Sequence, residues 1–302
     1  MAPKVTVFGE VLWDVLPGSK LAGGAPMNVV AHLHNYGIET EFISRVGNDE
    51  LGAELMAFIQ NQGLPTGLIQ TGQTHLTGIA KANISDTNEV TYKILHPVAW
   101  DYLQFEEKAL QKIKESDLFV YGSLAARDDL SRETLLTYVE NASMPVFDVN
   151  LRPPHYTREG VLLLMEYASV VKMNEHELKE ITGWLTDYEN DRQAMAFLKK
   201  LFRLQKVILT CGADGAMVLT ETDEFFSHPG FRVKVADTIG SGDAFLAAFL
   251  YQTLHQQTTQ DALEFACAAG ACVATRQGAL PAFTENDIHQ MIRRQHAGEA
   301  LI

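Results

Sequence analysis

The sequence DTIGSGD at residues 237–243 is followed at once by the apolar run AFLAAFL at residues 244–250. Such a run predicts a buried helix, and the two glycines before it leave backbone N–H groups open to an anion. The helix dipole adds to that attraction, so phosphate is the natural ligand of the turn Gly240, Ser241 and Gly242. Asp243 would lie in the first helical turn, where the same field favours its ionised form. In the simpler interpretation, Asp243 only stabilises the start of the helix.

Other phosphate-binding and metal-binding patterns do not fit the chain. The Walker A pattern is absent. The dinucleotide fingerprint needs a third glycine where Phe245 stands, and it usually lies in the first strand–helix unit of a chain. The ten histidines are scattered, and the sequence has no His-Glu-x-x-His or Cys-x-x-Cys pattern. A zinc site held by protein side chains is therefore not expected.

Around this turn, short apolar or β-branched runs alternate with amphipathic stretches. Nearly continuous apolar character predicts strands that are buried on both faces, at residues 4–8, 41–46, 118–121, 146–149, 170–173 and 207–210. Helical spacing predicts helices at residues 26–36, 50–61, 106–115, 132–141, 190–202 and 244–255, and a capping box predicts another at 285–295. The alternation indicates an α/β fold with parallel strands joined by helical crossovers.

One segment interrupts this alternation. Residues 76–95 contain two β-like stretches around the turn-rich sequence SDTN at residues 85–88, which predicts a hairpin. With residues 11–16 it would form a small sheet that projects from the main body, as a lid or a dimerisation surface. A plain edge hairpin is the alternative. The sequence shows no repeat and no linker, so we expect a single domain over residues 1–302.

Composition excludes several kinds of partner. The 302 residues include 24 Lys and Arg against 38 Asp and Glu, a formal charge of -14, and no basic stripe that could follow a phosphate backbone. Nucleic acid and membrane are therefore not expected as partners. No apolar run approaches the ~20 residues of a membrane-spanning helix, and the N-terminus lacks the apolar core of a signal peptide. The three cysteines do not all pair. We expect a cytoplasmic protein with reduced thiols.

A second cluster of candidate site residues lies near the N-terminus. The sequence GEVLWD ends at Asp14, and GGAPMN runs from Gly23 and Gly24 to Asn28 at the start of a predicted helix. Adjacent glycines permit close approach of the backbone to a ligand, and the two polar side chains supply the donors and acceptors that a polyhydroxylated substrate needs. Ordinary turn chemistry would explain the glycines equally well.

Together, residues 23–47 and 237–243 resemble the two signatures of the ribokinase-like, PfkB-type carbohydrate kinase family, in the family's order and at its separation. The resemblance covers essentially the whole chain and implies a three-layer α/β/α sandwich with a mostly parallel central sheet and a small β lid. Val30 departs from the signature, where relatives usually carry a smaller residue. The form GGAPMN, together with YGS at 121–123 and DVNLR at 148–152, is similar to fructokinases, whereas ribokinases tend to have Gly-Gly-Lys-Gly-Ala-Asn.

The resemblance also implies roles for particular residues. Asp14, Gly23, Gly24 and Asn28 would hold sugar hydroxyls, and Arg152 would face the sugar or the transferred phosphoryl group. The element KMNEHE, with Lys172, Asn174 and Glu177, would lie by the ATP phosphates, its Asn and Glu orienting Mg²⁺ through water. The resemblance further implies a nucleotide-binding turn with Thr210, Gly212 and Gly215. It places Cys267 near the adenine, where many relatives have an Asn. It also implies a K⁺ site at Asp237 and Gly278.

The function that follows is an ATP-dependent sugar kinase, with the 6-hydroxyl of fructose as the expected acceptor. Asp243 would accept the hydroxyl proton, and the backbone N–H groups of the glycine turn would hold the developing negative charge. Ribokinase, 2-keto-3-deoxygluconate kinase and nucleoside kinase remain alternatives within the family. A catalytically silent sugar-binding protein is the alternative outside the enzymes. A homodimer formed through the lid also fits the hairpin.

Overall fold

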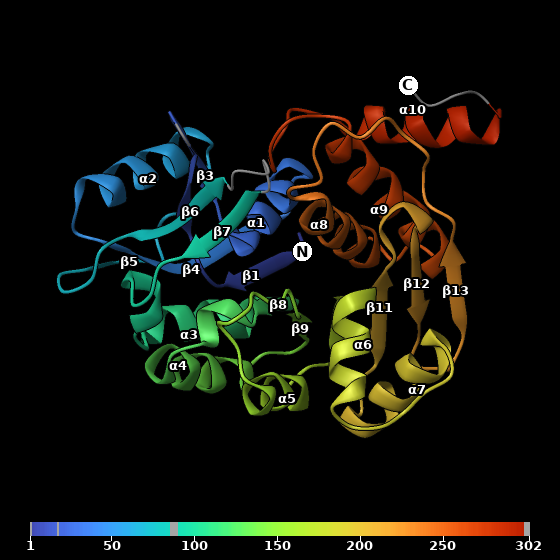
Figure 1. Ribbon diagram of the computed structural model, residues 1–302, viewed down its shortest axis with the longest axis horizontal. Coiled ribbons are helices and arrows are strands. Elements are labelled where there is room, and N and C mark those ends of the chain that lie inside the picture. The colour runs from blue at the N-terminus through green and yellow to red at the C-terminus, as the bar shows by residue number, and fades with distance from the viewer. Residues whose placement is uncertain (1, 17, 85–89, 299–302) are drawn as a thin grey trace.

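The computed structural model describes residues 2–16, 18–84 and 90–298 (Figure 1). In that part of the chain nine strands form the main sheet, in the order β13-β12-β11-β10-β9-β8-β1-β4-β5. All neighbouring pairs are parallel except β11 with β12 and β12 with β13. The strands are β1 Lys4–Phe8, β4 Glu39–Gly47, β5 Ile69–Gly72, β8 Leu118–Gly122, β9 Pro145–Asp148, β10 Val170–Asn174, β11 Lys206–Thr210, β12 Ala216–Leu219 and β13 Phe225–His228.

Helices cover both faces of this sheet, so the predicted three layers are present (Figure 1). One hydrophobic core contains residues of α1 Ala25–Asn35, α2 Glu50–Asn61, α8 Ser241–Leu254, α9 Thr259–Ala274 and α10 Glu285–His296. The other contains residues of α3 Glu107–Glu115, α4 Asp129–Val139, α5 Arg158–Glu166, α6 Glu175–Gly183 and α7 Asp191–Phe202. Side chains alternate between the two cores along a strand: Val120 of β8 faces the first, and its neighbours Phe119 and Tyr121 face the second.

The small sheet is separate and has the order β3-β2-β6-β7. Its strands are β2 Leu12–Leu16, β3 Ser19–Gly23, β6 Gly78–Ile84 and β7 Val90–Ile94. The β6–β7 hairpin is antiparallel and β2 joins β6 in parallel, so the predicted pairing of residues 11–16 with the hairpin is confirmed. The turn predicted at residues 85–88 lies outside the described residues. Strand β3 was not predicted, because SKLAG is mostly exposed and has no alternation of apolar and polar residues.

The helices and main-sheet strands expected from the sequence are present, with shifted ends. Helix α8 begins at Ser241, inside the glycine turn, because Gly240 takes a left-handed conformation (φ 77°) and caps the helix. The capping box at Thr284 and Asp287 is confirmed at the start of α10. Strands β5, β12 and β13 and helices α5 and α6 were not predicted. In α5 the apolar residues follow one another at 161–165, so the sequence shows no helical period there. No helix in the described ranges is both long and apolar enough to cross a membrane.

Candidate active site

Polar side chains converge where β1, β9 and β10 end and where α1 and α8 begin. Glu10 follows β1, Asp148 ends β9, and Lys172 lies on β10. Lys172 Nζ is 2.9 Å from Asp148 Oδ1, and both side chains are more than nine-tenths buried. Carboxyl ends of parallel strands meet at one edge of a sheet, which is where α/β proteins bind their ligands. We call the seven residues Glu10, Asp14, Asn28, Asp148, Arg152, Lys172 and Asp243 the active-site cluster.

Asp243 and Asn28 join the two sequence signatures directly. Asn28 Nδ2 donates a hydrogen bond of 2.7 Å to Asp243 Oδ2, across 215 residues of chain. Asn28 is buried, and its Oδ1 has no hydrogen-bond partner among the described residues. An unpaired buried acceptor costs free energy, so this atom is available to a ligand donor such as a sugar hydroxyl.

The glycine turn leaves space and donors at the start of α8. A Cβ on Gly240 would come within 2.6 Å of Ala279, and a Cβ on Gly242 would be 3.3 Å from Lys172 Nζ. The first N–H groups of a helix have no intrahelical acceptor, so the turn presents donors to an anion, although Ser241 N–H itself donates to the Thr238 carbonyl at 3.2 Å. Ser241 Oγ is buried and likewise has no partner in the described part of the chain. These features support phosphate binding at the turn, which stays a prediction from the sequence.

Burial changes the protonation of three carboxyl groups in the active-site cluster. The pKa of Asp243 rises to about 6, chiefly through burial and then through Asp148, although Asn28, Lys172 and Arg152 oppose the rise. Burial also raises the pKa of Asp14 to about 6 and that of Glu10 to about 7. The helix dipole therefore does not dominate at Asp243, contrary to the sequence-based expectation of an easily ionised group, because desolvation of the carboxylate is the larger effect.

Two cations offset this negative charge. Burial lowers the pKa of Lys172, but the carboxylates of Asp148, Glu177 and Asp243 more than compensate and leave it raised. Lys172 was expected by the ATP phosphates; its ammonium pairs with Asp148 and lies next to Gly242 of the glycine turn. Arg152 is exposed, and its charge lowers the pKa values of the three carboxyl groups above, so it lies among them at the open side of the cluster.

The two N-terminal glycines are required by close packing. Gly24 has φ 117°, and a Cβ there would lie 2.5 Å from the backbone oxygen of Glu10. A Cβ on Gly23 would lie 2.2 Å from Asp14 Oδ2. The glycines thus bring the chain against both acidic residues, as the expected sugar site requires.

Asn174 and Glu177 form a capping box at the start of α6. Glu177 N–H donates to Asn174 Oδ1 at 2.9 Å, and Asn174 N–H donates to Glu177 Oε2 at 2.8 Å. The other oxygen, Glu177 Oε1, accepts from Leu151 N–H at 2.9 Å. Glu177 therefore fixes the loop that carries Arg152, and a metal would reach this buried carboxylate through water rather than directly.

The remaining candidates lie along the neighbouring strands and loops. Thr210 ends β11 opposite Asn174, and the turn to β12 contains Gly212 and Gly215, both with positive φ. Cys267 is buried on α9. Asp237 accepts hydrogen bonds of 3.0 Å from the N–H groups of Ile239 and Gly278, and so brings together the two loops expected to form a cation site.

Sequence reasoning missed Glu10 and Asp148 as members of the cluster. Glu10 is buried and its Oε2 has no partner among the residues described. Both residues follow or end a predicted buried strand, and a charged residue in that position was the available signal.

This site, on a three-layer α/β/α fold, defines a class of enzymes that transfer a phosphoryl group to a small hydroxylated acceptor. Residues 4–286 match the family model described as pfkB family carbohydrate kinase, and the chain belongs to that family. It is 30% identical to "Probable fructokinase-7" of Arabidopsis thaliana, over 95% of this chain and 91% of that protein.

Solved structures show the same similarity. The ATP-bound fructokinase of Xylella fastidiosa superposes with a TM-score of 0.85 and 25% identity, covering 97% of this chain and 99% of that one. A double-mutant fructokinase of Vibrio cholerae O395, bound to fructose, ADP and potassium, gives a TM-score of 0.81 and 26% identity over 96% and 98% of the two chains. The family resemblance seen in the sequence is confirmed.

Proposed function

We propose that this protein transfers the γ-phosphoryl group of ATP to the 6-hydroxyl of fructose. The observation that carries the proposal is the contact between Asn28 and Asp243, which sets a half-buried carboxylate beside an unpaired acceptor and a glycine turn. Relatives and neighbours named as fructokinases support fructose as the acceptor.

Asp243 acts as the base that accepts the hydroxyl proton. A pKa of about 6 leaves it mostly ionised at neutral pH yet makes it a stronger base than an exposed Asp. Asp14, Gly23, Gly24 and Asn28 position the sugar, and Arg152 offsets charge at its open side. Phosphoryl transfer depends mainly on alignment and charge stabilisation, so holding the hydroxyl against Asp243 is the chief contribution of this half of the site.

ATP occupies the other half of the site. Its phosphates meet the N–H groups of Gly240 and Gly242, the unpaired Oγ of Ser241 and the ammonium of Lys172. Its base lies by Thr210, Gly212, Gly215 and Cys267. The excess of carboxylates over cations in the cluster suits Mg²⁺, held through water by Asn174 and Glu177, and the ion would neutralise phosphate oxygens. The two loops that the hydrogen bond from Gly278 N–H to Asp237 joins would hold K⁺.

The small sheet acts as a lid over the acceptor, within one kinase domain. Leu21, Leu76 and Leu95, on or beside its strands, are large apolar side chains exposed to solvent by 49%, 70% and 38%. Closure over the sugar would cover such a surface, and so would a second copy of the chain.

A coupled ADP assay tests this proposal directly. Fructose should stimulate Mg²⁺-dependent ADP formation, and ³¹P NMR should show fructose 6-phosphate as the product. Ribose, 2-keto-3-deoxygluconate and nucleosides serve as competing acceptors, and Asp243→Asn serves as the matched inactive protein. A higher kcat/KM with one of those acceptors would replace fructose, and ADP formation that needs no acceptor would reject the kinase assignment.

A further inference from the structure

A cavity of about 360 Å³ lies next to the active-site cluster, between α4, α5 and the chain that leaves the lid strand β7. Its twelve lining residues are His96, Ser123, Ala126, Arg127, Arg132, Pro154, His155, Tyr156, Thr157, Gly160, Val161 and Leu164. Ser123 also lines a small pocket bounded by Glu10 and Asp148, so the cavity adjoins the active site without containing its catalytic groups.

The charged lining of this cavity is entirely basic. Arg127, Arg132, His96 and His155 contribute, and no carboxylate lines it, in a chain whose formal charge is -14. The acidic partners lie elsewhere: Asp101 is fully buried behind Arg127, and Asp129 pairs with Arg132 from the solvent side with 84% of its side chain exposed. The two guanidinium groups therefore border the open space while their counterions are held outside it. Burial lowers the pKa of His155, which favours its neutral form, and His96 is paired with Asp128.

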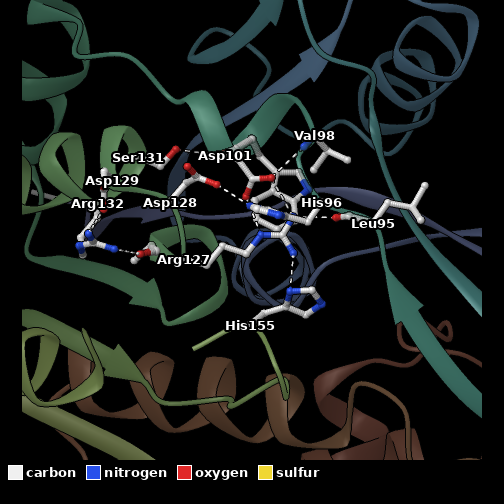
Figure 2. A network of polar contacts seen from close by, with 12 residues as sticks. Leu95, His96, Val98, Asp101, Arg127, Asp128, Asp129, Ser131, Arg132 and His155 are labelled. Carbon is white, nitrogen blue, oxygen red and sulfur yellow. Dashed lines mark hydrogen bonds and ion pairs between the residues drawn. The ribbon is translucent and has the colours of Figure 1, made fainter. Parts of the chain in front are cut away.

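Arg127 is fixed in place by contacts on several sides (Figure 2). Its Nε and Nη2 donate to the two oxygens of Asp101 at 2.7 and 2.8 Å, and Nη2 also donates to the Leu95 carbonyl at 2.7 Å. Nη1 lies 3.1 Å from His155 Nδ1, and the guanidinium lies 4.1 Å from the Trp100 ring centre. A guanidinium that is already ordered loses little entropy when it binds an anion.

A metal ion is a poorer fit to the same region. His96, Asp101 and Asp128 each place one ligand atom within 4.8 Å of the others. Asp101, however, already accepts from Arg127 through both oxygens, and a cation there would meet the guanidinium at close range. The two remaining residues, His96 and Asp128, already form a hydrogen bond of 2.6 Å with each other near the surface.

One side of α5 forms another part of the wall, through Thr157, Gly160, Val161 and Leu164. Thr157 Oγ1 caps this helix by accepting from Gly160 N–H, and its own hydroxyl proton is free to be donated to a ligand in the cavity. Guanidinium and hydroxyl groups are among the donors that proteins use to bind phosphate.

We propose that this cavity binds a phosphate dianion, either inorganic phosphate or the phosphoryl group of a small monoester, independently of the acceptor sugar. The ligand would contact His96, which follows the lid, and His155, which lies three residues beyond Arg152. It would therefore hold together the end of the lid and the loop that faces the acceptor.

Calorimetric titration of the full-length protein tests the site. Glycerol 3-phosphate and inorganic phosphate are titrated separately into enzyme saturated with a non-hydrolysable ATP analogue, Mg²⁺ and fructose, and glycerol is the uncharged control. We expect both anions to bind and glycerol to show no binding. Tighter binding of glycerol 3-phosphate would assign the site to a monoester, and equal binding would assign it to free phosphate.

Variants locate the binding. Arg132→Gln should weaken it roughly tenfold, the cost of losing a charge-assisted hydrogen bond, and Arg132→Lys should restore part of it. Arg203→Gln, which removes the same charge from an exposed position after α7, should leave binding unchanged. In the wild-type protein the amide signal of Gly160 should shift on titration. Absence of binding, an equal loss in both Gln variants or an unmoved Gly160 signal would overturn the proposal.

Discussion

Two buried ionic groups lie near the same edge of the sheet and differ in how completely they are paired. Around Arg127, each Asp101 oxygen accepts from the guanidinium, and Asp101 Oδ2 also accepts from Val98 N–H at 2.8 Å. In the active-site cluster, Glu10 Oε2, Asn28 Oδ1 and the adjoining Ser241 Oγ have no partner in the described part of the chain. The fully paired Arg127 also donates to the Leu95 carbonyl and so holds the end of strand β7. Unpaired buried groups instead cost stability, and they are kept where a ligand supplies the missing hydrogen-bond partner.

The largest effect is expected at the unpaired cluster. Asp243→Asn is nearly isosteric and should lower kcat by roughly 10² to 10⁴, because the base is lost while the sugar contacts remain. KM for fructose should stay within a few-fold. Steady-state kinetics checks this, and a variant that keeps more than a tenth of the wild-type kcat would exclude Asp243 as the base.

The free energy of unfolding should depend most on the fully paired group around Arg127. Arg127→Met leaves Asp101 charged and buried without its partner, and should cost about 3 to 5 kcal/mol of unfolding free energy. Asp243→Asn should not destabilise, because it removes one of several carboxylates that raise each other's pKa values. Urea denaturation compares the two, and similar losses would refute the contrast between the clusters.

Sugar binding should depend on the unpaired polar groups. Asp14→Ala or Asn28→Ala should each weaken the interaction with fructose by about 1 to 3 kcal/mol, seen in KM for fructose and not in KM for ATP. Asn28→Ala should also lower kcat, since Asn28 holds Asp243. If only the ATP parameter moved, the acceptor and nucleotide sites would be interchanged.

The raised carboxyl pKa values predict a pH dependence with a definite sign. Activity should fall as pH drops through about 6, where Asp243 takes up a proton. Between its unfolded pKa and about 6, the native state binds more protons than the unfolded state, so this group makes folding more favourable as pH falls. Asp243→Asn should therefore gain stability over wild type at pH 8 and lose that gain near pH 4. A constant difference across this range would contradict the raised pKa.

The lid should give the smallest energetic effect. A four-stranded sheet of this size buries little surface by itself, so amide exchange in residues 77–84 and 90–95 should be fast in the free protein and slow down when fructose binds. Shortening the segment at residues 85–88, which the sequence predicts as a turn, should raise ATP hydrolysis relative to fructose phosphorylation, because water would gain access. Exchange that is slow and unaffected by fructose would identify a fixed dimer contact or plain scaffold instead.

Local sequence patterns were sufficient to identify the class of fold, and they predict where along the chain the reaction takes place. Continuous apolar runs such as residues 118–121 predict strands covered on both faces, and a glycine turn before an apolar helix predicts an anion site. These signals are local, because backbone conformation and solvent exposure leave a periodic pattern within a few residues. The hairpin and the capping box at Thr284 could be predicted from the sequence for the same reason.

Which distant groups meet, and how far they are desolvated, depends on the packing of the whole chain. Packing placed Asn28 against Asp243, paired Lys172 with Asp148, and brought Glu10 into the active-site cluster. It also set the pKa of Asp243 to about 6, against the effect of the helix dipole, because burial depends on everything packed around a carboxylate. Contacts across 215 residues and the loss of water around a charge arise from packing, and no local spacing in a chain records them.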